Sequence, residues 1–277
     1  MRLARLQTSA GPRLTIESEE GWRELDLDHS DLTRLLGEGN GSALDRSGEA
    51  PLVSSAPSFL APLRPGKVIA IGLNYMDHVR ESGVEPPPRP LVFAKFPSTV
   101  IGPEQPIVLN PAIAERVDWE GELALIVGRR LSKASPEEAM AAVFGYTIAN
   151  DVSARDVQFA DGQWIRGKNL DSFCPLGPVV VGADDLPDPQ DTMLRTEVNG
   201  ETVQSASTKE MIFPIAELLS FCSQSFALEP GDVMLTGTPW GCGEFMDPQR
   251  SLVHGDVVEI SIDGIGTLRN PVVDPSL

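Results

Sequence analysis

The chain has 277 residues, a length that lets a protein bury roughly three-quarters of its unfolded surface in a full core without disulfides. Its 22 Lys and Arg against 40 Asp and Glu give a formal net charge of −18, which argues against a general binder of nucleic acid or of anionic membranes. The 41 % hydrophobic content fits a globular protein, and the absence of an apolar leader or long apolar run predicts a soluble, cytoplasmic one.

Residues 1–62 are expected to form a small N-terminal domain that ends in a proline-rich linker, and residues 63–277 a larger second domain. Short apolar stretches at Leu14–Ile16 and Leu25–Leu27 predict strands in the first domain. Four prolines fall within residues 51–66, and proline disfavours both helix interiors and central strands. We therefore expect this stretch to be extended.

The second domain is dominated by strand signals. Asn199-Gly200 and Asp263-Gly264 are typical of hairpin turns, so a purely parallel sheet is excluded. We expect a mixed, mainly β architecture with a few helices, of the α+β class. The predicted strands are Lys67–Ile71, Glu122–Val127, Phe144–Ala149, Pro178–Val181, Leu194–Val198, Thr202–Gln204, Asp232–Thr236, Val257–Ile262 and Gly266–Leu268.

Two helices have clear signals. Ser135 followed by Pro136 and Glu138 predicts a capped helix that runs to Val143 and ends before Gly145. A second helix has an apolar face formed by Ile215, Leu218, Leu219, Cys222 and Phe226. Cys222 is therefore assigned to the core. The three cysteines form no CxxC pair and no Cys/His cluster along the chain, so the spacing predicts neither a disulfide framework nor a zinc site.

Three carboxylates predict a metal site. In a strand, Glu120 and Glu122 point to one face, where their charges repel unless a cation or a proton lies between them. A solvated strand edge is the alternative for this pair. Asp151 follows a strand and opens a predicted short helix in which it meets Arg155 at i and i+4, and the alternative is a purely structural N-cap with an ion pair to Arg155. Oxygen donors favour Mg²⁺ or Mn²⁺, with Ca²⁺ as a further candidate and zinc disfavoured.

His78 and Glu81 are a candidate acid–base pair. On a helical turn they meet at i and i+3, and a carboxylate beside an imidazole suits a general base that acts on water. A surface His/Glu pair without a catalytic role is the alternative. Thr238 lies in a glycine-rich loop after a strand, where its hydroxyl and the loop amides can hold a carboxylate.

Taken together, the chain resembles the fumarylacetoacetate hydrolase superfamily, in the bacterial branch of acylpyruvate hydrolases, isomerases and decarboxylases. The resemblance covers residues 67–272. It implies a compact β-roll catalytic domain around a divalent metal, usually in a homodimer, with a small N-terminal β unit. The matching stretches, in order, are GLNYMDHVRESG, DWEGELALIVG, GYTIANDVSARDVQ, RGKNLDSFCPLGP, EVNGE, LTGTPWGCG and GDVVEISIDGIGTLRNPV.

The resemblance also implies a role for each candidate residue. The metal ligands would be Glu120, Glu122 and Asp151; Lys168 would stabilise the substrate enolate; Arg155, Gln158 and Thr238 would bind the substrate; and His78 with Glu81 would form the dyad of a lid. Where many members have an apolar residue this chain has Cys242, which we interpret as a small apolar substitute rather than a nucleophile.

The expected function is that of an enzyme, a metal-dependent hydrolase that cleaves a carbon–carbon bond in acylpyruvate-type 1,3-diketo acids. Its partner would be a small anionic keto acid, not nucleic acid or a membrane. The alternative is an oxaloacetate decarboxylase or a 2-hydroxyhepta-2,4-diene-1,7-dioate isomerase of aromatic catabolism, because the same enolate serves all three reactions. A metal-stabilised binding protein without activity is the hypothesis from a different class.

Overall fold

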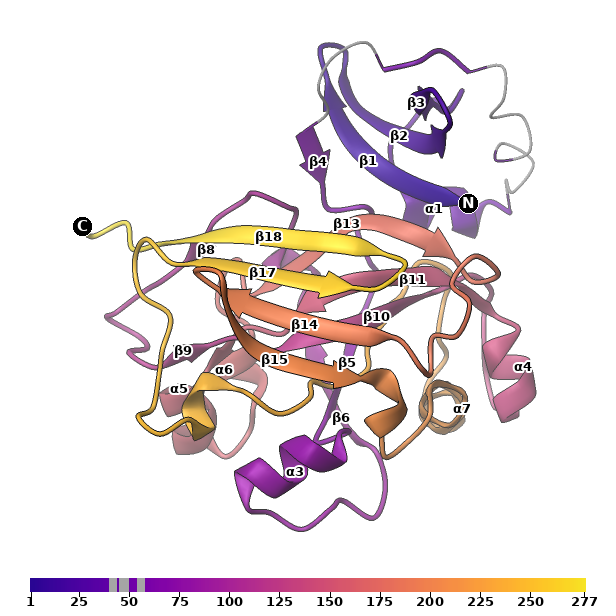
Figure 1. The fold of residues 1–277 in the computed structure, drawn as a ribbon. Helices are drawn as coiled ribbons and strands as arrows, with labels where there is room; N and C mark the ends of the chain where they lie inside the picture. Colours follow the sequence, from indigo (N-terminus) through magenta and orange to yellow (C-terminus); the bar gives the residue numbers. More distant parts are fainter. Residues whose placement is uncertain (40–43, 45–49, 54–57) are drawn as a thin grey trace.

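The structure is a computed structural model that describes residues 1–39, 44, 50–53 and 58–277. Strands dominate and helices are few and short, which confirms the mixed, mainly β prediction (Figure 1). The helices are α1 (Leu32–Gly37), α3 (Met76–Ser82), α4 (Pro136–Met140), α5 (Arg155–Asp161), α6 (Ile165–Lys168) and α7 (Ile215–Ser225). Short 3₁₀ turns lie at Pro97–Thr99, Thr208–Glu210 and Gly243–Phe245.

A large mixed sheet has β10 near its centre, in the order β3-β2-β1-β13-β11-β10-β16-β5-β6. Off this path, β4 pairs with β1 and β7 with β13, and β9 and β12 form a separate pair. The strands are β1 (Arg2–Thr8), β2 (Gly11–Ser18), β3 (Gly21–Glu24), β4 (Ser58–Leu60), β5 (Val68–Gly72), β6 (Leu91–Lys95), β7 (Val100–Ile101), β9 (Val117–Asp118), β10 (Gly121–Val127), β11 (Val143–Asn150), β12 (Ser153–Ala154), β13 (Cys174–Gly182) and β16 (Val233–Leu235).

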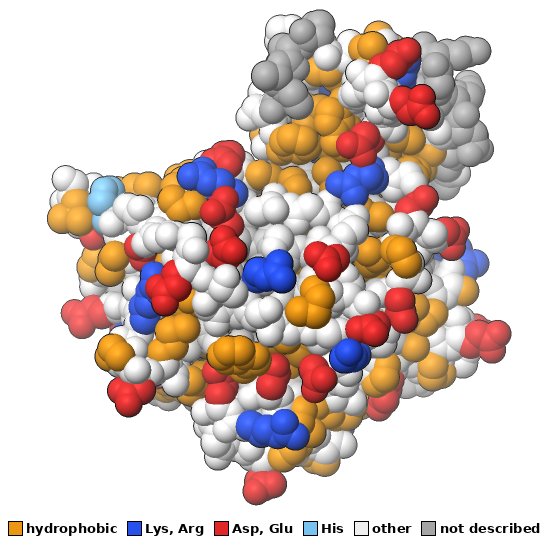
Figure 2. All heavy atoms as spheres, viewed as in Figure 1, with side chains coloured by type: hydrophobic (Ala, Val, Ile, Leu, Met, Phe, Trp, Pro, Cys, Tyr) orange, Lys and Arg blue, Asp and Glu red, His pale blue; other side chains and the backbone are white. Residues whose placement is uncertain are grey.

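A second sheet lies across one face of the first (Figure 1). Its order is β15-β14-β17-β18-β8, from Glu201–Ser207, Met193–Val198, Val257–Ile262, Gly266–Val273 and Ile107–Val108. Buried and partly exposed residues alternate along β17, as in a sheet with one face in water. Figure 2 views the molecule from this side, where acidic and basic side chains are interspersed rather than gathered in one patch.

Both faces of β10 are buried. Leu123 and Leu125 pack into the core shared with Val258 and Ile260 of the second sheet. Ala124 and Ile126, on the opposite face, belong to a second core cluster that includes residues of α1. The continuous apolar run at Glu122–Val127 is therefore the pattern of a central strand covered on two sides.

The N-terminal strands extend the large sheet, because β1 pairs antiparallel with β13. The predicted strand at Leu14–Ile16 lies within β2. The predicted strand at Leu25–Leu27 is wrong: β3 ends at Glu24, and the buried Leu25 packs from a loop against the core cluster of α1. In the proline-rich stretch, Ser58–Leu60 forms β4, whereas residues 54–57 lie outside the described residues. The division at residue 62 stays a proposal.

The strands predicted in the second domain are all present, and the Asn199-Gly200 turn has the positive φ angles, 56° and 79°, of a tight hairpin. Two helix predictions need correction. The helix after Ser135 ends at Met140, because the chain enters β11 at Val143. Helix α7 ends at Ser225, so Phe226 is 39 % exposed rather than part of the buried face, while Cys222 is buried as predicted.

The capping box of α4 gives a test of the local fold. The Ser135 hydroxyl accepts from the Glu138 amide at 3.2 Å, and the Ser135 amide donates to the Glu138 carboxylate at 2.8 Å. We expect Ser135→Ala to lower the free energy of unfolding by about 1 kcal/mol in urea titrations. The exposed Ser132, changed to Ala, should stay within about 0.5 kcal/mol of the parent. Equal losses in the two variants would contradict the cap.

Candidate active site

Three buried carboxylates meet where two neighbouring strands end. Glu120 directly precedes β10, Glu122 is its second residue, and Asp151 directly follows β11. The antiparallel register pairs Gly121 with Asn150 and so brings the two ends together. One oxygen from each carboxylate lies within 4.8 Å of the others. The structure therefore assembles the three predicted ligands in one cluster, although Glu120 stands just outside the strand.

Two lysines contact this cluster. Lys168, at the end of α6, places its Nζ 2.7 Å from Glu120 and 2.9 Å from Asp151. Lys95, at the end of β6, places its Nζ 2.6 Å from the other oxygen of Asp151. Lys168 was predicted and Lys95 was not. The available signal for Lys95 was its position at the end of the strand-like run LVFAK. Burying an unpaired cation is costly, so a lysine at the end of a buried strand indicates a nearby carboxylate.

The carboxylates differ in their electrostatics. Burial alone would raise the pKa of Glu120, but the Lys168 and Arg155 charges lower it to about 2. Burial, together with the charges of Asp151 and Glu120, raises the pKa of Glu122 well above its ordinary value. The Gly237 amide donates to Glu122 at 2.6 Å. In the described part of the chain, no lysine or arginine forms an ion pair with Glu122.

These residues fit a hard divalent cation. Oxygen donors that converge in a buried place, one of them without a cationic partner, are the ligand set of Mg²⁺ or Mn²⁺. The charges agree with this. Around the cluster, four buried carboxylates, Asp118, Glu120, Glu122 and Asp151, exceed by one the three buried cations Lys95, Arg155 and Lys168. A divalent ion would make this region net positive, as an anionic substrate requires.

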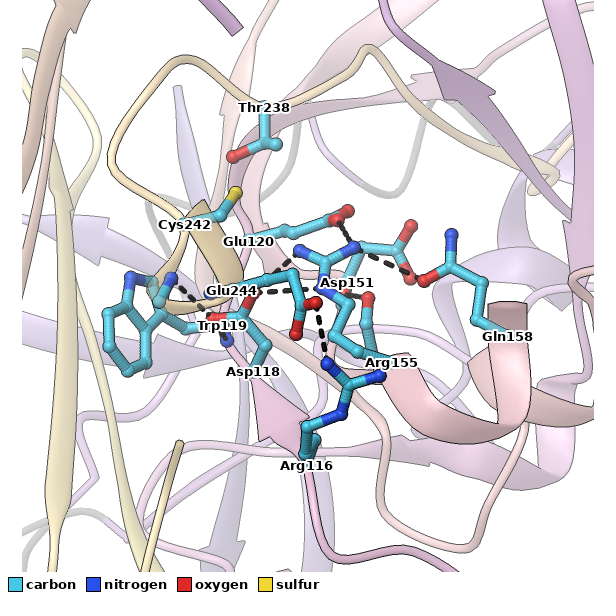
Figure 3. A network of polar contacts seen from close by, with 12 residues as sticks. Arg116, Asp118, Trp119, Glu120, Asp151, Arg155, Gln158, Thr238, Cys242 and Glu244 are labelled. Atoms are coloured by element: carbon cyan, nitrogen blue, oxygen red, sulfur yellow. Dashed lines mark hydrogen bonds and ion pairs between the residues drawn. The ribbon is translucent and has the colours of Figure 1, made fainter. Parts of the chain in front are cut away.

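Arg155 is held by a network that the sequence analysis did not predict (Figure 3). Its Nε donates to Asp118 at 2.8 Å, and its Nη1 lies 2.7 Å from Glu120 and 3.2 Å from Gln158. The predicted pair of Asp151 with Arg155 is wrong, because strand β12 lies between them and α5 begins only at Arg155. The position of Asp118 beside Trp119-Glu120 in the acidic motif was a signal for it.

Asp118 also ties the glycine-rich loop to the site. Its carboxylate accepts from the amides of Trp119 and Gly243, each at 2.8 Å, and from the amide of Glu244 at 3.2 Å. Arg116 in turn pairs with Glu244 at 2.8 Å. Figure 3 shows these side chains converging below Glu120 and Thr238. The contacts fix the loop that follows Thr238 relative to Arg155.

Thr238 is fixed from the second sheet by Gln204 of β15, a residue that the sequence analysis missed. The Gln204 amide donates to the Thr238 hydroxyl at 2.9 Å, and its oxygen accepts from the Gly121 amide at 2.9 Å and from Thr196 at 2.7 Å. The Thr238 hydroxyl donates to the Gly121 carbonyl at 2.9 Å. The buried Gln204 amide thus links the second sheet to the start of β10 in the large sheet and to Thr238.

His78 and Glu81 form the predicted pair on α3. The His78 Nδ1 lies 2.7 Å from one Glu81 oxygen, and the other Glu81 oxygen accepts from the Gly241 amide at 2.8 Å. The imidazole packs edge to face on Phe245, with ring centroids 5.7 Å apart. It is only 6 % exposed. The pair is therefore not the exposed surface pair that the sequence left open.

One cavity of about 260 Å³ joins these groups. Its size, slightly below the range of roughly 300–1,000 Å³ for drug-sized ligands, suits a small acid. The polar lining is His78, Ser82, Glu120, Arg155, Gln158, Lys168 and Thr238, and the large apolar lining is Ile71, Leu73, Val84, Phe159, Trp164 and Phe245. The other predicted residues touch this lining from behind: Glu81 contacts His78, Asp151 contacts Lys168, and Glu122 lies beside Glu120.

Comparison with known proteins gives consistent matches. The family model described as "Fumarylacetoacetate (FAA) hydrolase C-terminal" matches residues 67–273. Two curated relatives, from Xenopus laevis and Bos taurus, are named as mitochondrial oxaloacetate tautomerases. Each is 42 % identical to this chain, and the match spans 99 % of this chain and 90 % and 92 % of the two relatives. 

Solved structures agree over the whole chain. A fumarylacetoacetate hydrolase from Exiguobacterium antarcticum matches with a TM-score of 0.90 and 38 % identity over 99 % of both chains. A 2-hydroxyhepta-2,4-diene-1,7-dioate isomerase from Mycobacterium marinum matches with a TM-score of 0.80 and 36 % identity over 100 % of both chains. The two proteins are named for different reactions, hydrolysis in the first and isomerisation in the second.

Glu122 gives the test of the metal site. We expect Glu122→Gln to weaken Mn²⁺ binding at least about tenfold in calorimetric titrations, because an anionic oxygen ligand is lost. The fold should persist, since the change also relieves repulsion from Asp151 and Glu120. Glu217→Gln, at an exposed position of α7, is the matched control and should bind Mn²⁺ as the parent does. Unchanged Mn²⁺ binding in Glu122→Gln would remove this residue from the ligand set.

Proposed function

The chain belongs to the fumarylacetoacetate hydrolase family, and we propose that it is a divalent-metal-dependent enzyme that interconverts the keto and enol forms of oxaloacetate or of a closely similar small 2-keto dicarboxylic acid. The observation that carries this proposal is the cavity of about 260 Å³ whose lining brings the buried His78 together with Glu120 of the carboxylate cluster and with two buried cations. The names of the tautomerase relatives support oxaloacetate as the substrate.

The reaction needs a group that moves one proton. To form the enol, a proton leaves the methylene carbon, and the electron pair of that C–H bond becomes the carbon–carbon double bond while the keto oxygen gains a proton. We assign the proton transfer at carbon to His78, because this imidazole lines the cavity and Glu81 fixes the orientation of its ring.

The negative charge on the keto oxygen must be stabilised while the proton is away. We assign this role to Lys168, whose pKa stays above its ordinary value: burial alone would lower it, and the Asp151 and Glu120 charges more than offset that effect. This shift favours the charged form of the amine at the cavity wall. A divalent cation, Mg²⁺ or Mn²⁺ with Ca²⁺ as a further candidate, held by Glu120, Glu122 and Asp151, would supply a Lewis acid for the same oxygen.

Substrate binding must rely on local charge, because a protein with a net charge of −18 repels a dianion at long range. We assign the carboxylates of the substrate to Arg155, Gln158 and Thr238, which line the cavity. Guanidinium, amide and hydroxyl groups are the usual partners of a carboxylate. Asp118 accepts a hydrogen bond from Arg155, and Gln204 donates one to Thr238. These bonds hold both side chains in place and so support a preformed site.

The hydrolysis of acylpyruvates, which the sequence analysis placed first, is the second candidate. The His78–Glu81 pair favours it, because such a pair can also take a proton from water. The names of the tautomerase and isomerase relatives favour the alternative reactions more strongly than this one. Tautomerisation itself was not among the expected reactions, although it shares the enolate with all of them.

Two further proposals concern the state of the protein. We propose a homodimer, as the family resemblance implies, and the half-exposed Phe96 and Ile113, which line a shallow groove, are candidates for its interface. We also keep a cytoplasmic location as a proposal, supported by three buried free cysteines. No helix among the described residues is long and apolar enough to cross a membrane.

The function is tested with enol oxaloacetate. Its ultraviolet absorbance should decay faster with enzyme and Mg²⁺, coupling to malate dehydrogenase should detect the keto product, and EDTA should abolish the acceleration. His78→Ala should lose about 10²-fold to 10⁴-fold in rate, the range for a positioned acid–base group. Glu81→Gln should lose less, because the imidazole remains. His254→Ala, an exposed histidine far along the chain, is the matched control and should keep the parent rate.

The same preparation separates the rival reactions. Pyruvate formed from oxaloacetate, detected with lactate dehydrogenase, at a rate above that of tautomerisation would identify a decarboxylase instead. Turnover of acylpyruvates without turnover of enol oxaloacetate would identify the hydrolase. A parent rate in His78→Ala would refute the role of this residue.

The homodimer is tested by light scattering at micromolar concentration. We expect about twice the chain mass of 29.8 kDa. Phe96→Lys should shift the equilibrium toward the monomer if the groove is part of the interface, because a charge buried without a partner is costly. Exposed Leu277→Lys, at the end of the chain, is the control. A stable monomer of the parent protein would contradict the proposal.

A further inference from the structure

A second cluster of metal-binding side chains lies beside the carboxylate site. His78, Glu81 and Cys242 each offer a donor atom within 4.8 Å of the other two. The Cys242 Sγ lies 3.9 Å from the His78 Nδ1, the same nitrogen that contacts Glu81 at 2.7 Å. The linear sequence does not predict this cluster, because 164 residues separate Cys242 from His78.

We propose that His78, Glu81 and Cys242 bind a thiophilic divalent ion such as Zn²⁺, and that this ion inhibits the enzyme by taking His78 out of acid–base chemistry. The binding part of this proposal stands on the cluster alone. The inhibition part rests on the proposed function, in which His78 transfers the proton.

The donors and their spacing suit zinc. One nitrogen, one oxygen and one sulfur ligand with a fourth position left open is a set that zinc accepts in proteins. Zinc bonds of about 2.3 Å to sulfur and about 2.0 Å to nitrogen allow those two atoms to lie at most about 4.3 Å apart, and the observed separation is 3.9 Å. The short contact between Glu81 and His78 must open for an ion to bind there, while the other Glu81 oxygen can keep its bond from the Gly241 amide.

The thiol is inert without an ion. Burial, and then the charge of Asp118, raises the pKa of Cys242 well above its ordinary value, so Cys242 is a poor nucleophile, in line with the sequence-based interpretation. A bound Zn²⁺ favours the thiolate, and the thiol proton then leaves to solvent as the Zn–S bond forms. The Nδ1 of His78 must also give up any proton before it can bind the ion.

The two sites select different ions. The cluster of Glu120, Glu122 and Asp151 offers only oxygen, which suits Mg²⁺ or Mn²⁺, whereas sulfur and nitrogen favour zinc. Excess Mg²⁺ should therefore occupy the first cluster without filling the second. His78 lines the cavity, so an ion that enters with solvent reaches the second cluster past this side chain.

Co²⁺ is the probe, since a thiolate bound to Co²⁺ gives a charge-transfer band in the near ultraviolet that oxygen ligands do not give. Protein saturated with Mg²⁺ is titrated with Co²⁺ and then with Zn²⁺. We expect a band that saturates at one equivalent and that Zn²⁺ abolishes. Cys222→Ala, which removes a buried cysteine of α7, should keep the band, and Cys242→Ala should lose it. Glu81→Gln should weaken Co²⁺ binding at least about tenfold.

The rate assay tests inhibition separately. With Mg²⁺ in excess, the Zn²⁺ concentration that halves the rate should be at least about tenfold higher in Cys242→Ala than in Cys222→Ala. Absence of the band in the parent, or its survival in Cys242→Ala, would overturn the site whatever the enzyme's reaction is. A band without inhibition would overturn the regulatory role. Equal inhibition of both variants would mean that Zn²⁺ acts by displacing Mg²⁺, and it would overturn that role as well.

Discussion

The repulsion among Glu120, Glu122 and Asp151 is the constraint on which the rest of this site depends. Three carboxylates buried within 4.8 Å of one another are unfavourable unless positive charge is brought to them. The fold brings that charge from distant parts of the chain, with Lys95 at the end of β6 and Lys168 at the end of α6. The ion pairs satisfy Glu120 and Asp151 and leave Glu122 to the Gly237 amide. A cluster with one carboxylate left without a cationic partner favours the binding of one more cation.

The two-sheet architecture makes this arrangement rigid. Strand β10 is covered on both faces, so its first residues cannot move without disturbing both cores. Gln204 of the second sheet bonds to the Gly121 amide between the two glutamates and to Thr238. Asp118 bonds to Arg155 and to the loop at Gly243. Arg155 and Thr238, which line the cavity, are therefore each fixed by a partner behind them, the arrangement that preorganised sites require.

The sequence predicted what depends on neighbouring residues and missed what depends on distant ones. Strands such as Val257–Ile262 and the Asn199-Gly200 turn follow from local pattern and backbone preference. The period of two predicted that Glu120 and Glu122 lie close together, whereas Asp151 was added as a proposed ligand through the family resemblance, because its position depends on the pairing of β10 with β11. The partners Lys95 and Gln204 were not predicted, since their roles arise from packing across 56 and 83 residues. The predicted pairing of Arg155 with Asp151 was wrong for the same reason. The partner of Arg155 is Asp118, which lies upstream in strand β9.

The surroundings of His78 bear on which of the proposed reactions this site suits. Hydrolysis needs a water molecule beside the base at the moment of attack, whereas tautomerisation needs only that the base keep the proton and return it. The imidazole is 6 % exposed and is flanked by the ring of Phe245 and the buried Cys242. Because His78 lines the small cavity, a bound substrate would lie beside the imidazole, and the water that this substrate displaces could not protonate an enolate. The packing around His78 therefore supports the proposed return of the proton to the substrate rather than the activation of water.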